Sequence, residues 1–192
     1  MGEVVTSWSQ LRIPLRLPEG MPNLAEQPSI RITDRAAIIR RAREAAGEAE
    51  LVVRRWSWPG AGGKPVYNFR SDGRTLGESA TGGRCLIPVS GFYEFTAPPD
   101  GSAKKAPKSK WAFEAAGLDW FCIAGLWRTD PAVGEAWTML TCEPGPDVAP
   151  YHHRQVVVLT PPDYARWLDP AVPAAELCHP APAGTLTVRQ ER

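Results

Sequence analysis

Apolar residues come in short runs separated by turn residues along most of the chain. Runs rich in branched and aromatic residues are typical of β-strands. The predicted strands cover residues 29–32, 66–69, 84–88, 92–95, 111–115, 120–127, 137–140 and 156–159. The last run is apolar throughout, which predicts a fully buried strand. One short helix is predicted at 163–168, because the preceding Pro161 and Pro162 suit a first helical turn.

Residues 34–50 fit two structures. Their alanines and charged side chains favour a helix by propensity. The same residues also fit a strand at 37–40 and a turn at Gly47, followed by a second strand at 51–58. We predict the hairpin, for a reason that depends on the resemblance described below.

The composition indicates one globular domain. The chain has 192 residues, of which 43% are hydrophobic and 22% charged, so it can bury a sizeable core. Its 20 prolines and 17 glycines predict short strands and many turns. Residues 15–23 are predicted to be a connector, 71–83 a loop, and 97–110 a flexible loop rich in Pro, Lys, Gly and Ser. The fold class predicted for residues 1–192 is a single α+β domain dominated by β structure.

Charge and cysteine content exclude several classes of protein. A net charge of +1 excludes a bulk polycation but not a local basic groove. No apolar run approaches the roughly 18 to 20 residues that span a bilayer, and no secretory signal is present. We therefore predict a soluble cytoplasmic protein with no membrane partner. The four cysteines form no C-x-x-C pair, so the sequence predicts no metal site and no cofactor, only buried, reduced thiols.

The first candidate site segment surrounds Asn68, which has strand-like neighbours although asparagine is depleted in strands. A buried amide must be hydrogen-bonded, so Asn68 could hold a ligand or a catalytic group. A turn asparagine at a strand end is an equally good interpretation.

The second segment contains Glu94 between Tyr93 and Phe95. A carboxylate desolvated by aromatic neighbours has a raised pKa, which suits general acid or base chemistry. Strict alternation, however, favours Tyr93 and Phe95 pointing inward and Glu94 pointing into water.

The third segment is His152-His153-Arg154, directly before the buried strand. Histidine titrates near neutral pH and can transfer protons. A solvated surface loop is the alternative. Adjacent residues on an extended chain face opposite ways, so at most one histidine is expected to enter a shared site.

Aromatic and basic residues also suggest nucleic acid as a partner. Trp56 and Trp58 would face the same side of one strand, and with Arg54 and Arg55 they could stack on bases and contact phosphates. Most of the eight tryptophans are expected in the core. The lysines of the 97–110 loop could also contact phosphates.

Taken together, ordered blocks of this sequence resemble the SOS response-associated peptidase family of abasic-site processing proteins. The blocks are Arg55–Pro59, Asn68–Ser71, Arg84–Phe95, Ala124–Trp127, Leu140–Thr141 and His152–Arg154, the last running into 156–159. Pro22-Asn23 is similar to the family's early asparagine turn. The resemblance covers about residues 20 to 170. It implies a β-barrel-like core of mixed and antiparallel sheet with a few short helices, which is why we prefer the hairpin at 37–58.

The resemblance also implies a function. Family members act on single-stranded DNA with an abasic site, whose sugar opens to an aldehyde. The α-amine of an N-terminal cysteine forms a Schiff base with this aldehyde, and its thiol closes a thiazolidine ring, giving a covalent DNA–protein crosslink. The peptidase label reflects autocatalytic processing of the N-terminus.

The same resemblance assigns roles to residues of this chain. Asn68 would orient the N-terminal residue or the opened sugar, Glu94 would move protons, and His152 would act as acid or base toward the sugar hydroxyl. Arg70 and Arg154 would hold phosphates, and Trp56 and Thr141 would line the DNA channel. We expect a monomer.

Position 2 departs from the family pattern, because it is Gly2 and not cysteine. As written, the chain cannot form the thiazolidine and could at most form a Schiff base through the Gly2 amine. Either the cysteine-bearing strand is missing from the N-terminus, or this is a relative that binds single-stranded DNA without catalysis. The presence of Asn68, Glu94 and His152 favours the first explanation. A third hypothesis is a small-molecule hydrolase that uses Glu94 and His152.

Overall fold

The computed structural model describes residues 8–19, 27–43, 47–73, 76, 83–98 and 106–192. Its elements in chain order are η1 (Trp8–Leu11), β1 (Leu15–Arg16), β2 (Arg35–Arg41), β3 (Ala49–Trp56), β4 (Trp58–Pro59), η2 (Ala61–Gly63), β5 (Pro65–Val66), β6 (Asn68–Arg70), β7 (Arg84–Val89), β8 (Gly91–Thr96), β9 (Ser109–Ala115), β10 (Phe121–Asp130), β11 (Gly134–Cys142), β12 (Gln155–Val156), β13 (Val158–Leu159), α2 (Pro161–Leu168), η3 (Ala174–Glu176) and β14 (Leu186–Gln190). Within the described residues, no helix is both long and apolar enough to cross a membrane.

Five strands close into a barrel. β3 pairs with β2, β2 with β7, β7 with β10 and β10 with β11, each time antiparallel. β11 then pairs in parallel with β3, with Trp137 opposite Trp56, and this pairing completes the ring. Closure satisfies the backbone groups that a sheet edge would expose. The predicted β-barrel-like α+β domain is confirmed.

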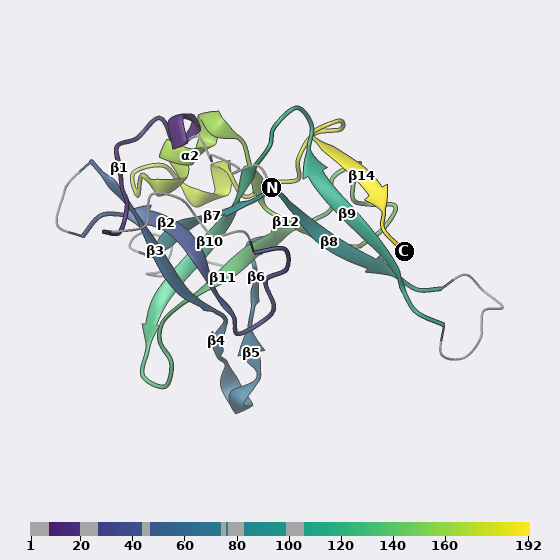
Figure 1. The fold of residues 1–192 in the computed structure, drawn as a ribbon, viewed down its shortest axis with the longest axis horizontal. Helices are drawn as coiled ribbons and strands as arrows, with labels where there is room; N and C mark the ends of the chain where they lie inside the picture. Colours follow the sequence, from purple (N-terminus) through teal and green to yellow (C-terminus); the bar gives the residue numbers. More distant parts are fainter. Residues whose placement is uncertain (1–7, 20–26, 44–46, 74–75, 77–82, 99–105) are drawn as a thin grey trace.

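The barrel strands alternate between two apolar clusters, as the pleat requires. One cluster fills the barrel interior, with alternate residues from all five strands: Ala36, Ile38, Val52, Trp56, Cys85, Ile87, Phe121, Ile123, Trp137 and Met139. The other cluster lies on the outer surface, where Tyr164, Trp167 and Leu168 of α2 cover it. Figure 1 shows α2 lying against one side of the barrel, near β7 and β10. The buried face of α2 therefore covers the outer apolar cluster.

A smaller sheet of β8, β9 and β14 extends from the barrel (Figure 1). It is joined to the barrel through β7 and the short bend at Ser90, and it has its own core around Phe113, Val148 and Leu186. Gly91 is required at the junction, because a Cβ there would lie 2.6 Å from the backbone oxygen of Phe113. This sheet carries Glu94.

The hairpin prediction is confirmed, because β2 and β3 pair from Arg35 opposite Arg55 to Arg41 opposite Ala49. The predicted strand at 29–32 is wrong. Thr33 has a φ of 83°, a conformation rare for a branched residue, and the Asp34 carboxylate accepts a hydrogen bond from the Arg31 backbone. Residues 29–32, although their polar and apolar side chains alternate, therefore form part of a turn that leads into β2.

Trp56 and Trp58 do not share a face, contrary to the prediction. Ser57 between them has a φ of 78°, and its N–H donates to the Trp137 carbonyl at 2.7 Å. This kink ends β3, so Trp56 packs in the barrel interior and Trp58 in the outer cluster.

The remaining predictions match in part. The predicted strands from residue 84 onward each have a counterpart in the structure, the 156–159 run is divided into β12 and β13, and the predicted helix is α2. β14 was not predicted, and the predicted connector includes β1. Of the predicted 97–110 loop, residues 109–110 belong to β9 and 99–105 lie outside the described residues, as do Gly2 and Pro22-Asn23.

The barrel has two mouths. The charged mouth lies where β3 and β11 begin, and four barrel residues meet there: Arg40, Glu50, Arg54 and Glu135. The site mouth lies at the opposite ends of the same strands, where Trp56 ends β3 and Val89 ends β7. β6 pairs in parallel with the end of β11 and so also lies at the site mouth.

Candidate functional site

Glu94 lies on the inward face of β8, which reverses the alternation prediction. Its side chain is 19% exposed, whereas the neighbouring Tyr93 and Phe95 residues are 39% and 44% exposed. The inward face of β8 is fixed by Phe92, which stacks on Phe113 of β9 at 5.0 Å between ring centroids. Glu94, two residues on, therefore points the same way as the core residue Phe92.

His152 is the ionisable neighbour of Glu94. Its Nδ1 lies 3.8 Å from Oε1 of Glu94. Burial raises the pKa of Glu94 above its ordinary value, and the nearby His152 only partly offsets this. No hydrogen bond within the described chain reaches the Glu94 carboxylate, which leaves its oxygens available to a ligand.

A tight turn places His152 beside Glu94. The His152 N–H donates to the Val148 carbonyl at 3.0 Å, and the ring of Tyr151 packs against Trp111 of β9 at 4.5 Å. The turn is thereby attached to the small sheet that carries Glu94. His153 is exposed, and of the two histidines His152 is the one that lies at Glu94. The two rings do not face opposite ways as alternation predicts, because they lie in a turn and contact each other at 4.5 Å between centroids.

The backbone of Arg154 contacts the His152 ring. Nδ1 of His152 lies 2.8 Å from the Arg154 carbonyl oxygen and 3.2 Å from the Arg154 nitrogen. Nδ1 would accept from the Arg154 N–H in one tautomer and donate to the Arg154 carbonyl in the other. The two contacts therefore hold the ring at Nδ1 in either tautomer.

The Arg154 side chain is bound at its tip by Asp72. Nη1 and Nη2 of Arg154 donate to the two Asp72 oxygens at 2.9 and 2.5 Å. Nη2 also donates to the Thr141 carbonyl at 2.8 Å. The hydrogen bond from Arg154 is the main cause that lowers the pKa of Asp72 below its ordinary value. Both the N–H and the hydroxyl of Ser71 donate to the same Thr141 carbonyl, at 2.9 and 3.0 Å.

Sequence reasoning did not find Asp72. It follows the Asn68–Ser71 block directly, but its partner Arg154 is distant in sequence. The only local signal is an acidic residue before Gly73, which is an ordinary turn pattern.

The other predicted site residues lie along β6 and the end of β3. Asn68 and Arg70 are both exposed, opposite Met139 and Thr141 of β11 in the parallel pairing. Asn68 is thus not the buried amide considered above, and within the described residues no hydrogen bond joins it to Glu94 or His152. Trp56 stacks on Trp137 at 5.6 Å, and its Nε1 donates to the Tyr67 carbonyl at 3.0 Å.

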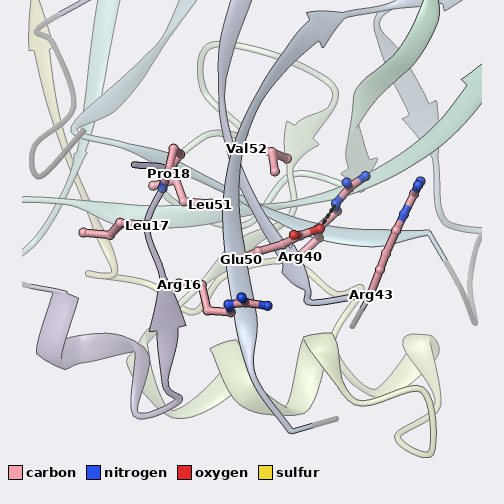
Figure 2. Close-up of a pocket in the computed structure, with 8 residues that line it drawn as sticks. All are labelled: Arg16, Leu17, Pro18, Arg40, Arg43, Glu50, Leu51 and Val52. Atoms are coloured by element: carbon pink, nitrogen blue, oxygen red, sulfur yellow. Dashed lines mark hydrogen bonds and ion pairs between the residues drawn. The ribbon is translucent and has the colours of Figure 1, made fainter. Parts of the chain in front are cut away.

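The charged mouth is built differently. Glu135 accepts hydrogen bonds from Arg40, Arg43 and Arg54, and Arg40 also donates to Glu50 at 2.7 Å. A cavity of about 350 Å³ lies beside this network (Figure 2). Figure 2 shows Arg40 and Glu50 paired at its wall, with Arg43 alongside. Because these charges are paired with one another, the cavity lacks the available acid and base groups of the site mouth.

The cysteines provide no nucleophile at either mouth. Burial raises the pKa of all four thiols, to about 12 for Cys142 and about 11 for Cys178. They are therefore protonated at neutral pH, whereas the thiolate is the nucleophilic form. Among the described residues, no three His, Cys, Asp or Glu side chains gather in a way that could hold a metal ion.

Comparison with known proteins gives one sequence match and several structural ones. The sequence profile described as "SOS response associated peptidase (SRAP)" matches residues 17–190. A search of curated protein sequences finds no match.

The structural matches are crystal structures of bacterial proteins. One protein from Bordetella bronchiseptica is 24% identical with a TM-score of 0.69, and the match covers 97% of this chain and 96% of that one. A phage-related protein from the same organism is 20% identical with a TM-score of 0.64, covering 89% and 86%. A protein from Bacteroides thetaiotaomicron is 19% identical with a TM-score of 0.64, covering 83% and 75%. At these identities the matches establish the fold alone.

Proposed function

This chain belongs to the SOS response-associated peptidase family, and from this membership we propose that it processes abasic sites in single-stranded DNA. Family membership supports a role in the response to DNA damage, with DNA as the partner. The finer proposal is a covalent bond between the protein's N-terminal residue and the opened sugar of the abasic nucleotide.

One observation carries this proposal: Glu94 and His152, from distant parts of the chain, lie 3.8 Å apart. Schiff-base formation needs proton transfers in both directions, and positioned acid and base groups assist such transfers. Burial raises the pKa of Glu94, so at a given pH more of its carboxyl is protonated than in an exposed glutamate. Glu94 is therefore the proposed proton donor, with His152 beside it as a second group that can exchange protons.

The proposed chemistry begins with the α-amine attacking the aldehyde carbon. A C–N bond forms, and one proton moves from the nitrogen to the aldehyde oxygen to give a carbinolamine. Glu94 then protonates the hydroxyl, water leaves as the nitrogen lone pair forms the C=N bond of the Schiff base, and the remaining nitrogen proton returns to the Glu94 carboxylate. An N-terminal cysteine thiol would add to this C=N bond, and the nitrogen would take up the proton, which closes the thiazolidine without oxidation or reduction.

The other predicted residues have supporting roles in this proposal. His152 exchanges a proton with the sugar hydroxyl, and Asn68 orients the sugar or the N-terminal residue. Arg70 and Arg154 contact phosphates, since guanidinium groups suit phosphate recognition. Trp56 and Thr141 line the path of the strand.

The test is a denaturing gel with a single-stranded oligonucleotide that contains one abasic site. The chain with Gly2 and the variants Gly2→Cys and Gly2→Ser are compared, after mass spectrometry confirms the loss of Met1. We expect a heat-stable adduct with Gly2→Cys alone. Gly2 and Gly2→Ser should form an adduct only when borohydride reduces the Schiff base, because they offer an amine without a thiol. No adduct under either condition, from Gly2→Cys or from a chain extended at its N-terminus to begin Met-Cys, would contradict the proposal.

Gly2 favours a second candidate function, a non-catalytic protein that binds single-stranded DNA. This candidate predicts binding that weakens with salt and is unaffected by Glu94→Ala. The Glu94–His152 pair also fits the hydrolase hypothesis. Absence of any DNA adduct, combined with ester hydrolysis that Glu94→Gln abolishes, would favour that third function.

A further inference from the structure

Asp72 occupies one whole edge of the Arg154 guanidinium group. The two hydrogens of Nη2 are directed to Asp72 and to the Thr141 carbonyl, and one hydrogen of Nη1 is directed to Asp72. A guanidinium has five N–H donors, so Nε–H and the second Nη1 hydrogen remain. The Arg154 side chain is only 14% exposed. Its position is thus determined by Asp72 and β11, and its remaining donors can serve a ligand.

The same arginine controls His152 through its backbone. Both the carbonyl oxygen and the N–H of Arg154 contact Nδ1 of His152, at 2.8 and 3.2 Å. These contacts hold the ring at Nδ1 and leave Nε2 directed away from Arg154. Outer groups that orient a histidine commonly determine its activity.

Four residues are therefore connected in series. Asp72 binds the Arg154 side chain, the Arg154 backbone binds His152, and His152 lies 3.8 Å from Glu94. Asp72 itself does not contact either of the proposed proton-transfer groups. An effect of Asp72 on the reaction would have to pass through Arg154.

We propose that Asp72 is a positioning residue: by anchoring Arg154, whose backbone contacts Nδ1 of His152, it keeps the His152 ring in place beside Glu94. This inference rests on the proposed function, because it specifies how one residue of that site is kept ready. The simpler alternative is that Asp72 only fastens the 71–73 turn to β11. The two differ in whether Asp72 matters once His152 is gone.

The first experiment is a double-mutant cycle in the Gly2→Cys background. The single-turnover rate of heat-stable adduct formation is measured at saturating DNA for the background, Asp72→Asn, His152→Asn and the double variant. We expect Asp72→Asn to slow the reaction about 10-fold or more, since small displacements of a reacting group cost on the order of 100-fold. In the double variant Asp72→Asn should add little to the loss from His152→Asn, because coupled residues are not additive. An equal loss in both backgrounds, or no loss, would overturn the proposal.

The matched control is Asp130→Asn. Asp130 pairs with Arg128 at 3.1 Å near the charged mouth, so this variant also removes a carboxylate from an Asp–Arg pair. It should leave the adduct rate unchanged. Asp72→Glu should recover part of the rate, since it restores the charge.

A second measurement does not depend on activity. Nitrogen-15 NMR of the imidazole rings reports the environment of the two His152 nitrogens, which are assigned by comparison with His152→Asn. We expect the Nδ1 resonance to shift in Asp72→Asn, because the Arg154 backbone is no longer held against the ring. If Gly2→Cys makes no adduct, the proposed function fails, and this spectrum alone decides the role of Asp72. An unchanged His152 spectrum in Asp72→Asn would overturn that role.

Discussion

Both mouths of the barrel carry charged side chains, but the two groups differ in what they leave available. At the charged mouth, Glu135 accepts from three guanidinium groups and Arg40 contacts two carboxylates. On β8, which follows the end of β7 at the site mouth, the Glu94 carboxylate accepts no hydrogen bond within the described chain, and its ionisable neighbour is His152. The side chains at the charged mouth are paired with one another, whereas the Glu94 carboxylate can still accept a hydrogen bond from a ligand.

The difference also appears in the pKa values of the two acids. Burial opposes ionisation of both carboxylates, but hydrogen bonds from Arg54 and Arg40 lower the pKa of Glu135 below its ordinary value. Glu94 has no such donors, and burial raises its pKa. Hydrogen-bond donors thus favour the ionised form of Glu135 at the charged mouth, whereas burial without such donors favours the protonated form of Glu94 on β8. Burial alone does not decide the protonation of a carboxyl group; the hydrogen-bond donors around it also do.

The largest expected effect tests this contrast through two matched changes. In the Gly2→Cys background, Glu94→Gln should slow adduct formation by about 10² to 10⁴-fold, the usual contribution of general acid–base catalysis. Binding of an oligonucleotide with an unreactive abasic analogue should be unchanged. Glu50→Gln should instead lower the free energy of unfolding and leave the rate of adduct formation per folded molecule unchanged. Single-turnover kinetics with parallel denaturation curves separates these outcomes, and a rate loss in both variants would remove the distinction.

The next effect concerns stability. Arg40 has a side chain only 4% exposed, stacks over Trp127 at 4.1 Å and pairs with Glu50 and Glu135. Arg40→Ala removes the partner of Glu50 and one of the three guanidinium groups on Glu135, and should lower the free energy of unfolding by about 3 to 5 kcal/mol. Urea denaturation measures this change. If the loss is below about 1 kcal/mol, the charged mouth does not stabilise the barrel as its contacts indicate.

Much of the barrel could be predicted from sequence, because its strands are short apolar runs between turn residues. The outward and inward faces were harder to predict. Aromatic residues lie on both faces of β8, so alternation gave Glu94 the wrong side. Packing of Phe92 on Phe113 decides the face, and that contact joins different strands. Trp58 packs in the outer cluster and not beside Trp56 in the barrel interior, because Ser57 between them has a positive φ. The pattern of apolar residues does not indicate that kink.

Long-range charge pairs were the least predictable feature. The resemblance named Arg154 and His152, but Asp72 becomes relevant only when the fold brings it to Arg154. The charged mouth was not predicted either, because its residues appear in sequence as ordinary polar positions of strands. Sequence patterns describe which face of an element is apolar, and they contain little information about which distant charges meet.

A smaller effect is expected in the dependence of stability on pH. The folded-state pKa of Glu94 is above its unfolded value, so the protonated carboxyl is favoured by folding. Its contribution to stability is fully present below the unfolded pKa, and it is lost as pH rises through the folded pKa. Glu94→Gln cannot ionise, so its stability relative to the parent should increase between acidic and neutral pH. Thermal melts across that range test this, and a parent that gains stability over Glu94→Gln as pH rises would contradict it.

The smallest effect should come from the rim of the charged mouth. Arg16 and Glu48 lie 3.7 Å apart with side chains 54% and 40% exposed, in contrast to the buried Arg40. Exposed ion pairs contribute about 0 to 1 kcal/mol and are screened by salt. Arg16→Ala should therefore change the unfolding free energy by less than about 1 kcal/mol. Salt at about 0.5 M, several times the physiological ionic strength, should remove most of that change. A loss as large as that of Arg40→Ala would mean that the exposed Arg16 contributes to stability as much as the buried Arg40. The cavity in Figure 2, which both arginines line, would then be part of the stabilising charge network.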